Sequence, residues 1–375
     1  MFILDFSSNI QVEHLGHYHR RPPREIASGS SNLQKPDTPS PLNLFNLDNS
    51  GPLSGAPRSE VHIFILSAPR NSDARRTIRE TWLSRAQAHA LDGALPNQMR
   101  VYYRIVSWHF VVGTLALDER SRQELQSEQD VYSDILLLDH LVDSYGNLTE
   151  KLLASFVALV ETGLQFEYLL KCDDDSFVRL EALLFELENL RFGIADDSPW
   201  YQFQGASPYD PQRPLYMGFF RGDAPVQRAG AWREGSWFLA DRYLPYAHGG
   251  GYLLSASLVA FVARAAPHLQ RYANEDVSLG VWLAPLAINR VHSPRFDTEF
   301  VSRGCLNAHI VSHKLRADEQ RQRWRALETD NVGGSPLTLR MCANESERLR
   351  AFRYDWHVPP SRCCIRNLSL VHQRP

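Results

Sequence analysis

The chain has 375 residues, of which 43% are hydrophobic and 11% aromatic, and its formal net charge is −3. This length and apolar content are enough to bury a substantial core in one large or two small domains. The small negative charge excludes a nucleic-acid partner held by bulk electrostatics. No apolar run reaches the roughly 18 residues that a membrane-spanning helix needs.

Residues 1–58 are rich in proline, serine and glycine and lack apolar periodicity, which predicts a flexible stem. The fold is expected to begin at Val61–Leu66, an apolar run typical of a buried strand. The next segment, SAPRNSDARRTIRETWL, predicts a loop and then a helix that begins near Asn71 or Ser72. The arginines of this helix either bind nucleotide phosphates or brace the fold through carboxylates, and they are Arg75, Arg76 and Arg79.

Two further strand-like runs follow. Val101–Val112 is rich in aromatic and β-branched residues and predicts a strand or hairpin, and Asp134–Asp139 predicts a buried strand. The segment DSYGNLTEKLLASFVALVETG then shows a helical apolar stripe and carries Lys151, another candidate cation for phosphate. Asn147 and Glu150 stand three residues apart, as in a capping box, which would occupy the amide of Asn147.

Three consecutive carboxylates, Asp173, Asp174 and Asp175, end the short apolar run Tyr168–Leu170 and precede a leucine-rich helical pattern. Adjacent anions repel one another, and a hard divalent cation is the usual compensation. In an extended segment Asp173 and Asp175 point one way and Asp174 the other. An acidic loop with a helix N-cap is the alternative interpretation.

Strands and helices alternate between residues 61 and 191, which predicts an α/β fold with a mostly parallel central sheet flanked by helices. In such sheets ligands bind beyond the carboxyl ends of the strands, which is where the three carboxylates fall. The chain has no G-x-G-x-x-G sequence after its first strand, so the fingerprint of an NAD-binding fold is absent.

The segment 232–255 is crowded with aromatic residues around Gly249, Gly250 and Gly251, and glycine permits close approach of the backbone. Its aromatic side chains either stack on sugars or belong to the core, and they include Trp237, Tyr243, Tyr246 and Tyr252.

A second acidic pair, Glu275 and Asp276, opens a predicted helix, where acids also complement the helix dipole. Asp276 becomes a candidate general base if it lies in the same crevice as the three carboxylates. Among His292, His309 and His313, the last is the best placed to bind a ligand, because it ends an apolar run at a strand end.

Cys172 is expected to be a buried free thiol. The other four cysteines allow three pairings, and they are Cys305, Cys342, Cys363 and Cys364. N-glycosylation triplets occur at Asn147, Asn344 and Asn367. Triplets beside a cysteine cluster favour the lumen of the secretory pathway over the cytosol.

Five motifs, in their order and spacing, resemble the β1,3-galactosyltransferase family of Golgi enzymes, glycosyltransferase family 31. They are SAPRNSDARRTIRETWL, DSYGNLTEKLL, LLKCDDDSFVRL, PYAHGGGYLLS and NEDVSLG, and the resemblance runs from about Val61 to His313. RFDTEFVSRGC and the C-terminal YDWHVPPSRCC are most similar to members that add the second galactose of the proteoglycan linkage region, which extends the resemblance to about Arg366.

The resemblance implies a GT-A-type, Rossmann-like catalytic domain over residues 59–366, followed by a tail at 367–375. It implies inverting transfer of galactose from UDP-galactose to O3 of a terminal β-galactose, with Mn²⁺ as cofactor. The implied acceptor is Galβ1,4-xylose on a proteoglycan core protein, and the implied location is the Golgi lumen.

Carried onto this sequence, the resemblance makes Asp175 and His313 metal ligands, places Asp173 and Asp174 in the metal shell or on the donor ribose, and makes Asp276 the base. The implied donor contacts are Arg75, Arg76, Arg79 and Lys151. The implied substrate contacts are Trp237, Gly250, Gly251, Tyr252 and Glu275.

Family members typically carry an N-terminal membrane anchor, which this sequence does not show, so a truncated sequence, an incorrect start or a secreted form is expected. Residues 96–109 are longer than the family pattern. A β1,3-N-acetylglucosaminyltransferase of the same family is one alternative. The other is a non-catalytic, metal-dependent carbohydrate-binding protein, which would have no need of Asp276.

Overall fold

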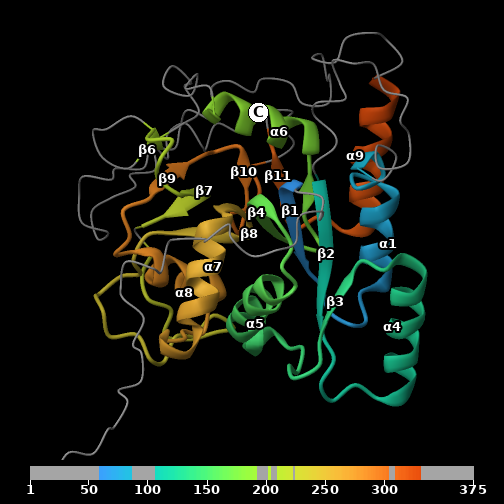
Figure 1. The fold of residues 1–375 in the computed structure, drawn as a ribbon, viewed down its shortest axis with the longest axis horizontal. Helices are drawn as coiled ribbons and strands as arrows, with labels where there is room; N and C mark the ends of the chain where they lie inside the picture. The colour runs from blue at the N-terminus through green and yellow to red at the C-terminus, as the bar shows by residue number, and fades with distance from the viewer. Residues whose placement is uncertain are drawn as a thin grey trace, which may run out of the picture. The chain divides into compact units, whose positions relative to one another are not determined.

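The computed structural model describes residues 59–86, 106–191, 202–203, 209–222, 224–303 and 309–330 (Figure 1). Within these ranges no helix is both long enough and apolar enough to cross a membrane. Several predictions lie outside the described residues: the stem, the tail, most of 96–109, the four C-terminal cysteines, and Asn344 and Asn367. The prediction for Cys172 is confirmed, because it is a buried free thiol.

Eight strands of the described chain form one sheet in the order β3-β2-β1-β4-β8-β7-β9-β6. Their bounds are β1 Ser59–Leu66, β2 Val106–Gly113, β3 Ile135–Leu138, β4 Phe166–Asp173, β6 Gln202–Phe203, β7 Leu215–Arg221, β8 Tyr246–Ser255 and β9 Asn289–His292. Only β8 and β6 run antiparallel to their neighbours. The predicted mostly parallel α/β sheet is therefore confirmed.

Helices cover both faces of this sheet (Figure 1). Their bounds are α1 Ser72–Glu80, α4 Glu119–Tyr132, η2 Tyr145–Asn147, α5 Leu148–Glu161, α6 Leu180–Arg191, α7 Ala256–Ala265, η4 Ala266–His268, α8 Glu275–Leu283 and α9 Ala317–Asp330. Ile63 and Ile65 of β1 belong to the apolar cluster that includes α1, α6 and α9, whereas Phe64 and Leu66 belong to the cluster that includes α5, α7 and α8. The strand is apolar throughout because both of its faces are buried.

A second, three-stranded sheet lies beside the end of β4. It has the order β10-β11-β5, with bounds β5 Phe177–Val178, β10 Phe296–Asp297 and β11 Val311–Ser312. Strand β11 pairs antiparallel with β5, so that Ser312 lies opposite Phe177. This pairing brings His313, just after β11, next to Asp175, just before β5.

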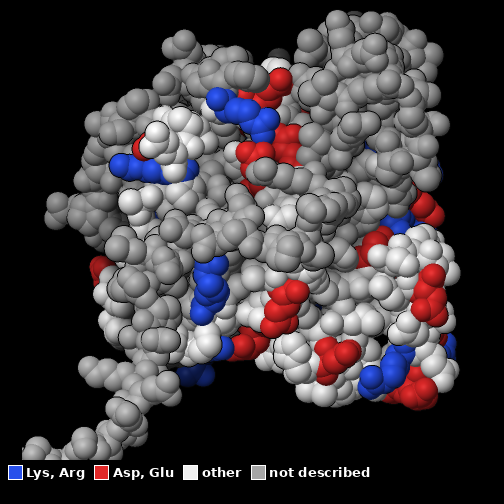
Figure 2. Space-filling model, in the orientation of Figure 1, with Lys and Arg blue, Asp and Glu red and all other residues white. Residues whose placement is uncertain are grey.

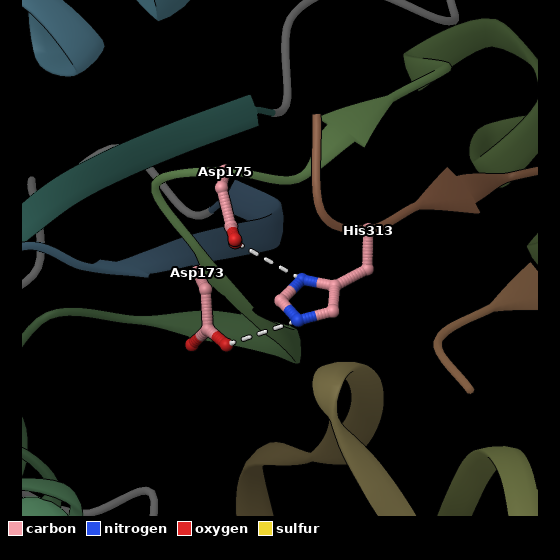
Figure 3. A group of neighbouring side chains, drawn as sticks. All are labelled: Asp173, Asp175 and His313. Atoms are coloured by element: carbon pink, nitrogen blue, oxygen red, sulfur yellow. Dashed lines mark ion pairs between the residues drawn. The ribbon is translucent and has the colours of Figure 1, made fainter. Parts of the chain in front are cut away.

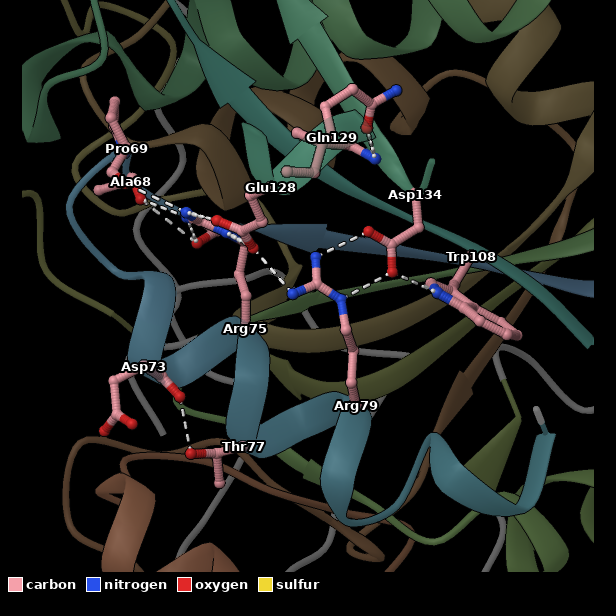
Figure 4. Close-up of polar contacts among 12 residues, drawn as sticks. Ala68, Pro69, Asp73, Arg75, Thr77, Arg79, Trp108, Glu128, Gln129 and Asp134 are labelled. Atoms are coloured by element: carbon pink, nitrogen blue, oxygen red, sulfur yellow. Dashed lines mark hydrogen bonds and ion pairs between the residues drawn. The ribbon is translucent and has the colours of Figure 1, made fainter. Parts of the chain in front are cut away.

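Two arginines of α1, Arg75 and Arg79, brace the fold, which corrects their assignment to the nucleotide donor. Arg75 makes a bidentate ion pair with Glu128 of α4, and Arg79 pairs with both Glu128 and Asp134 (Figure 4). Both guanidinium groups are buried, and the carboxylates of Glu128 and Asp134 compensate their positive charges. These charges are therefore not free to bind a phosphate. Arg76 is exposed and pairs with Asp73.

Helix α4 was not predicted, and the reason is its polarity. Only Leu125 is buried among its fourteen residues, so no apolar stripe marks it as a helix. Its exposed face carries acidic and basic side chains side by side (Figure 2), and Arg120 pairs there with Glu124. Such exposed pairs contribute little to stability, because solvent screens them. The helix is held instead by the contacts of Glu128 with the α1 arginines.

Candidate active site

A cavity of about 1100 Å³ lies at the carboxyl ends of β1 and β4. It is lined by the loop 67–71 after β1, by the carboxylates after β4 and by the first turn of α8. Strand β1 pairs with β2 on one side and with β4 on the other. The order in which successive strands are added to the sheet therefore reverses between β1 and β4. Crevices at such reversal points are the usual ligand sites of α/β sheets.

Asp173 and Asp175 face the imidazole of His313 (Figure 3). Asp175 Oδ1 lies 3.0 Å from Nδ1 of His313, and Asp173 Oδ2 lies 4.0 Å from Nε2. Asp174 points elsewhere and accepts a 2.8 Å hydrogen bond from Nδ2 of Asn71. The segment is a turn, closed by a bond from the Ser176 amide to the Asp173 carbonyl, rather than the expected extended strand.

The three facing side chains fit a divalent cation. Their ligand atoms lie within 4.8 Å of one another. Asp175 Oδ1 is buried, yet no donor of the described residues is oriented to hydrogen-bond it. Burial alone would lower the pKa of His313, but the carboxylates of Asp175 and Asp173 raise it. Two carboxylates and an imidazole leave coordination positions for phosphate oxygens and water, a combination that suits Mn²⁺.

Two glycines of β8 make room for side chains of the site. A Cβ on Gly250 would lie 2.5 Å from Cγ of His313, and one on Gly249 would lie 2.5 Å from Oε1 of Glu275. A Cβ on Gly251 would meet Val311, so that glycine serves the packing of β8 on β11 and does not line the cavity. The glycines were predicted to allow close approach of the backbone, and what the backbone approaches here is protein side chains.

Lys171 of β4 joins the two acidic sites, and the sequence analysis missed it. Its side chain is only 1% exposed. Nζ donates to Asp173 Oδ1 at 2.8 Å, to Glu275 Oε1 at 2.9 Å and to the Gly249 carbonyl at 2.5 Å. A charged residue inside an apolar strand was the signal, because burial of an ammonium group requires anionic partners.

Asp276 lies in the first turn of α8 and lines the same cavity. Its Oδ2 accepts a bond from the Gly249 amide at 3.0 Å, and its Oδ1 accepts one from the Val277 amide at 2.8 Å. Burial, with the charge of Glu275 added, raises the pKa of Asp276 to about 8. Once deprotonated, a carboxylate with such a pKa is a stronger proton acceptor than an ordinary one.

Comparison with known families agrees with this arrangement. A sequence model of the galactosyltransferase family matches residues 73–294, more than half of the chain. The chain belongs to the galactosyltransferase family. It is therefore a glycosyltransferase, and glycosyltransferases act with an activated sugar donor and an acceptor.

Individual relatives of this galactosyltransferase-family chain differ in the sugars that their names give. Mouse beta-1,3-galactosyltransferase 6 is 39% identical over 317 residues, covering 84% of this chain and 86% of the relative. Human UDP-GalNAc:beta-1,3-N-acetylgalactosaminyltransferase 2 is 32% identical over 204 residues, covering 54% of this chain and 36% of the relative. Hydroxyproline O-galactosyltransferase GALT6 of Arabidopsis thaliana is 27% identical, covering 73% and 36%.

Lys151 of this transferase lines the cavity, but its ammonium group already binds protein oxygens. Its Nζ donates to the Ser67 carbonyl at 2.7 Å and to Asp143 Oδ2 at 2.6 Å, so it holds the loop after β1 in place. The capping box predicted at Asn147 is wrong, because Asn147 makes no side-chain cap bond. Its amide instead donates to the Val142 carbonyl at 3.0 Å.

The aromatic residues assigned to sugar binding need correction. Tyr252 is fully buried in the core, and Trp237 packs with Tyr243 and Tyr272 while its Nε1 donates to the Ala240 carbonyl. Neither lines the cavity of the transferase. The exposed aromatic side chains at the cavity come from other positions, which are Tyr145, Trp232 and Phe300.

His292 and His309 of the transferase are structural. Both are buried away from the cavity, and burial is the main cause that lowers the pKa of each to about 3. In the unfolded chain each of these histidines binds a proton as the pH falls below about 6.5, whereas in the folded chain each stays neutral until about pH 3. Each histidine therefore lowers the stability of the fold as the pH falls below about 6.5.

Replacing His309 by glutamine is expected to remove this penalty. Relative to the parent protein, His309→Gln should gain about 1.4 kcal/mol of unfolding free energy per pH unit between about pH 6 and pH 4. Urea unfolding at several pH values measures the difference, and His140→Gln, at an exposed histidine, is the control. Equal pH dependence in the parent and in His309→Gln would contradict a neutral buried imidazole.

Proposed function

We propose that the protein transfers galactose from UDP-galactose to O3 of a terminal β-galactose, with inversion at the anomeric carbon. The observation that carries the proposal is that Asp276, whose two carboxylate oxygens are held by backbone amides, lines the same cavity as Asp173, Asp175 and His313. The donor sugar and the β1,3 linkage are supported by the similarity to mouse beta-1,3-galactosyltransferase 6.

The donor would occupy the end of the cavity formed by β1 and β4. Asp173, Asp175 and His313 would hold Mn²⁺, which when bound supplies positive charge beside the diphosphate leaving group. The loop after β1 is fixed on both sides: Lys151 binds the Ser67 carbonyl, and Asn71 binds Asp174. A loop fixed in this way presents a preformed surface to the nucleotide.

The acceptor would occupy the end of the cavity formed by α8. Asp276 takes the proton of the O3 hydroxyl as that oxygen attacks C1 of the donor galactose from the face opposite UDP. The C1–O bond to UDP breaks as the new glycosidic bond forms, so an α-linked donor gives a β-linked product. The amides of Gly249 and Val277 hold the carboxylate in one orientation for this transfer.

The sequence motifs support Galβ1,4-xylose on a proteoglycan core protein as the acceptor, and the Golgi lumen as the place of action. A β1,3-N-acetylglucosaminyltransferase would use the same base and the same metal ligands. An assay with UDP-galactose and UDP-N-acetylglucosamine therefore distinguishes the two activities. Membership in a transferase family disfavours the earlier alternative of a binding protein without turnover.

A UDP-release assay tests the proposal. Donors are UDP-galactose, UDP-N-acetylglucosamine and UDP-N-acetylgalactosamine, and acceptors are methyl β-galactoside, a Galβ1,4-xyloside and a β-xyloside. We expect the highest rate with UDP-galactose and the Galβ1,4-xyloside, loss of that rate with EDTA, and recovery with Mn²⁺. Absence of turnover with both galactosides would reject the proposal. Turnover with only one of the other two donors would show that the transferred sugar is not galactose but the sugar of that donor.

A further inference from the structure

Three exposed aromatic side chains meet at the mouth of the cavity, and we call them the aromatic rim: Tyr145, Trp232 and Phe300. They are 58%, 42% and 67% exposed. They come from separate segments, namely η2, the loop between β7 and β8, and the loop after β10. All three line the cavity. Large exposed aromatic groups that gather beside a cavity indicate a binding surface.

The rim is held in a fixed arrangement. Nε1 of Trp232 donates a hydrogen bond to the hydroxyl of Tyr145. The rings of Trp232 and Phe300 meet edge to face, with centroids 5.5 Å apart and planes at 82°. Lys314 lies over the ring of Phe300, with Nζ 3.7 Å from the ring centroid. Rings fixed before binding lose little conformational freedom when a ligand packs on them.

Side-chain contacts tie the rim to two segments of the candidate active site. The Trp232 carbonyl accepts a bond from Nδ2 of Asn274, two residues before Asp276. At the other end Phe300 contacts Lys314, which directly follows His313. The rim therefore contacts both the segment that leads into Asp276 and the segment that follows His313.

We infer that the aromatic rim binds the second sugar of the acceptor, the residue that carries the galactose to be modified. The inference rests on the proposed function. The reacting hydroxyl must reach Asp276, which is partly buried, so the next pyranose ring remains at the mouth. One face of a pyranose presents C–H groups that pack on aromatic rings, while its hydroxyls stay hydrated.

Kinetics with matched acceptors tests the rim. Trp232→Ala and Phe300→Ala are each expected to raise KM for the methyl glycoside of Galβ1,4-xylose about tenfold. KM for methyl β-galactoside and for UDP-galactose should change by less than about twofold, because neither ligand is assigned to the rim. Phe238→Ala is the control, since Phe238 is 74% exposed on the same loop as Trp232 and does not line the cavity.

Two kinetic outcomes would overturn the inference. One is an unchanged preference for the disaccharide over the monosaccharide in both variants. The other is a rise in KM for UDP-galactose of the same size, which would assign the rim to the nucleotide. Either result leaves the transfer itself standing.

If the parent protein transfers galactose to neither galactoside, the proposed function fails and binding decides the inference separately. Saturation-transfer NMR with the disaccharide, Mn²⁺ and UDP measures it. Contact of the xylose protons with the parent, and its loss in Trp232→Ala but not in Phe238→Ala, would support the rim. Absent contact in the parent, or contact retained in Trp232→Ala, would overturn it.

Discussion

Asp276→Asn is expected to lower kcat about 10³-fold while UDP still binds. The amide cannot take the proton of the attacking hydroxyl, whereas Asp173, Asp175 and His313 are unchanged. Turnover is measured by UDP release, and UDP affinity in the presence of Mn²⁺ is measured by calorimetry. The two measurements separate loss of a base from loss of the donor site.

The matched control for this variant is Asp130→Asn, because Asp130 is exposed on α4 and bonds only to Gln126 among the described contacts. Its kcat should equal that of the parent. Thermal unfolding of both variants shows whether either is misfolded. Parent-like turnover in Asp276→Asn would remove Asp276 from the role of base.

Lys171→Met is expected to cost about 3–5 kcal/mol of unfolding free energy, because it leaves the carboxylates of Asp173 and Glu275 without their shared cation. Methionine has a similar length, so the loss reports charge more than volume. Urea unfolding measures it. Mn²⁺ should restore part of the stability, since a bound cation again compensates Asp173.

Arg120→Met, at an exposed ion pair, is the control and should leave the unfolding free energy nearly unchanged. Lys171→Arg keeps the charge and should fall between the parent and Lys171→Met, limited by the larger guanidinium group. A loss below about 1 kcal/mol in Lys171→Met would contradict the role of Lys171 as the shared counter-ion.

The sequence patterns predicted the strands that are buried on both faces, and the reason is visible in β1 and β4. Neither strand alternates, because helices cover both sides of the sheet. The apolar pattern does not reveal strand direction, so the antiparallel β8 beside β4 was not foreseen. Its glycines were noticed, but the side chains that they accommodate come from distant segments.

The aromatic residues show what a local sequence pattern does not predict, namely which side chains are buried and which line the cavity. Trp232 and Trp237 are five residues apart in one loop and have the same chemistry. Trp237 is buried because Tyr243 and Tyr272 pack around it, whereas the ring of Trp232 contacts Tyr145 and Phe300 at the cavity mouth. Such partners are set by the tertiary structure. The same holds for Arg79, whose carboxylate partners are 49 and 55 residues away.

The short pairing of β5 with β11 has a consequence for how the chain folds. Ser176 and His313 are 137 residues apart in sequence, yet their side chains meet beside the three carboxylates. Two residue pairs join the strands, and two backbone hydrogen bonds flank them: the Leu315 amide donates to the Asp175 carbonyl and the Arg179 amide donates to the Ile310 carbonyl. A cation bound by Asp173, Asp175 and His313 would close that long loop as a crosslink does, and its affinity would add directly to the stability of the closed chain.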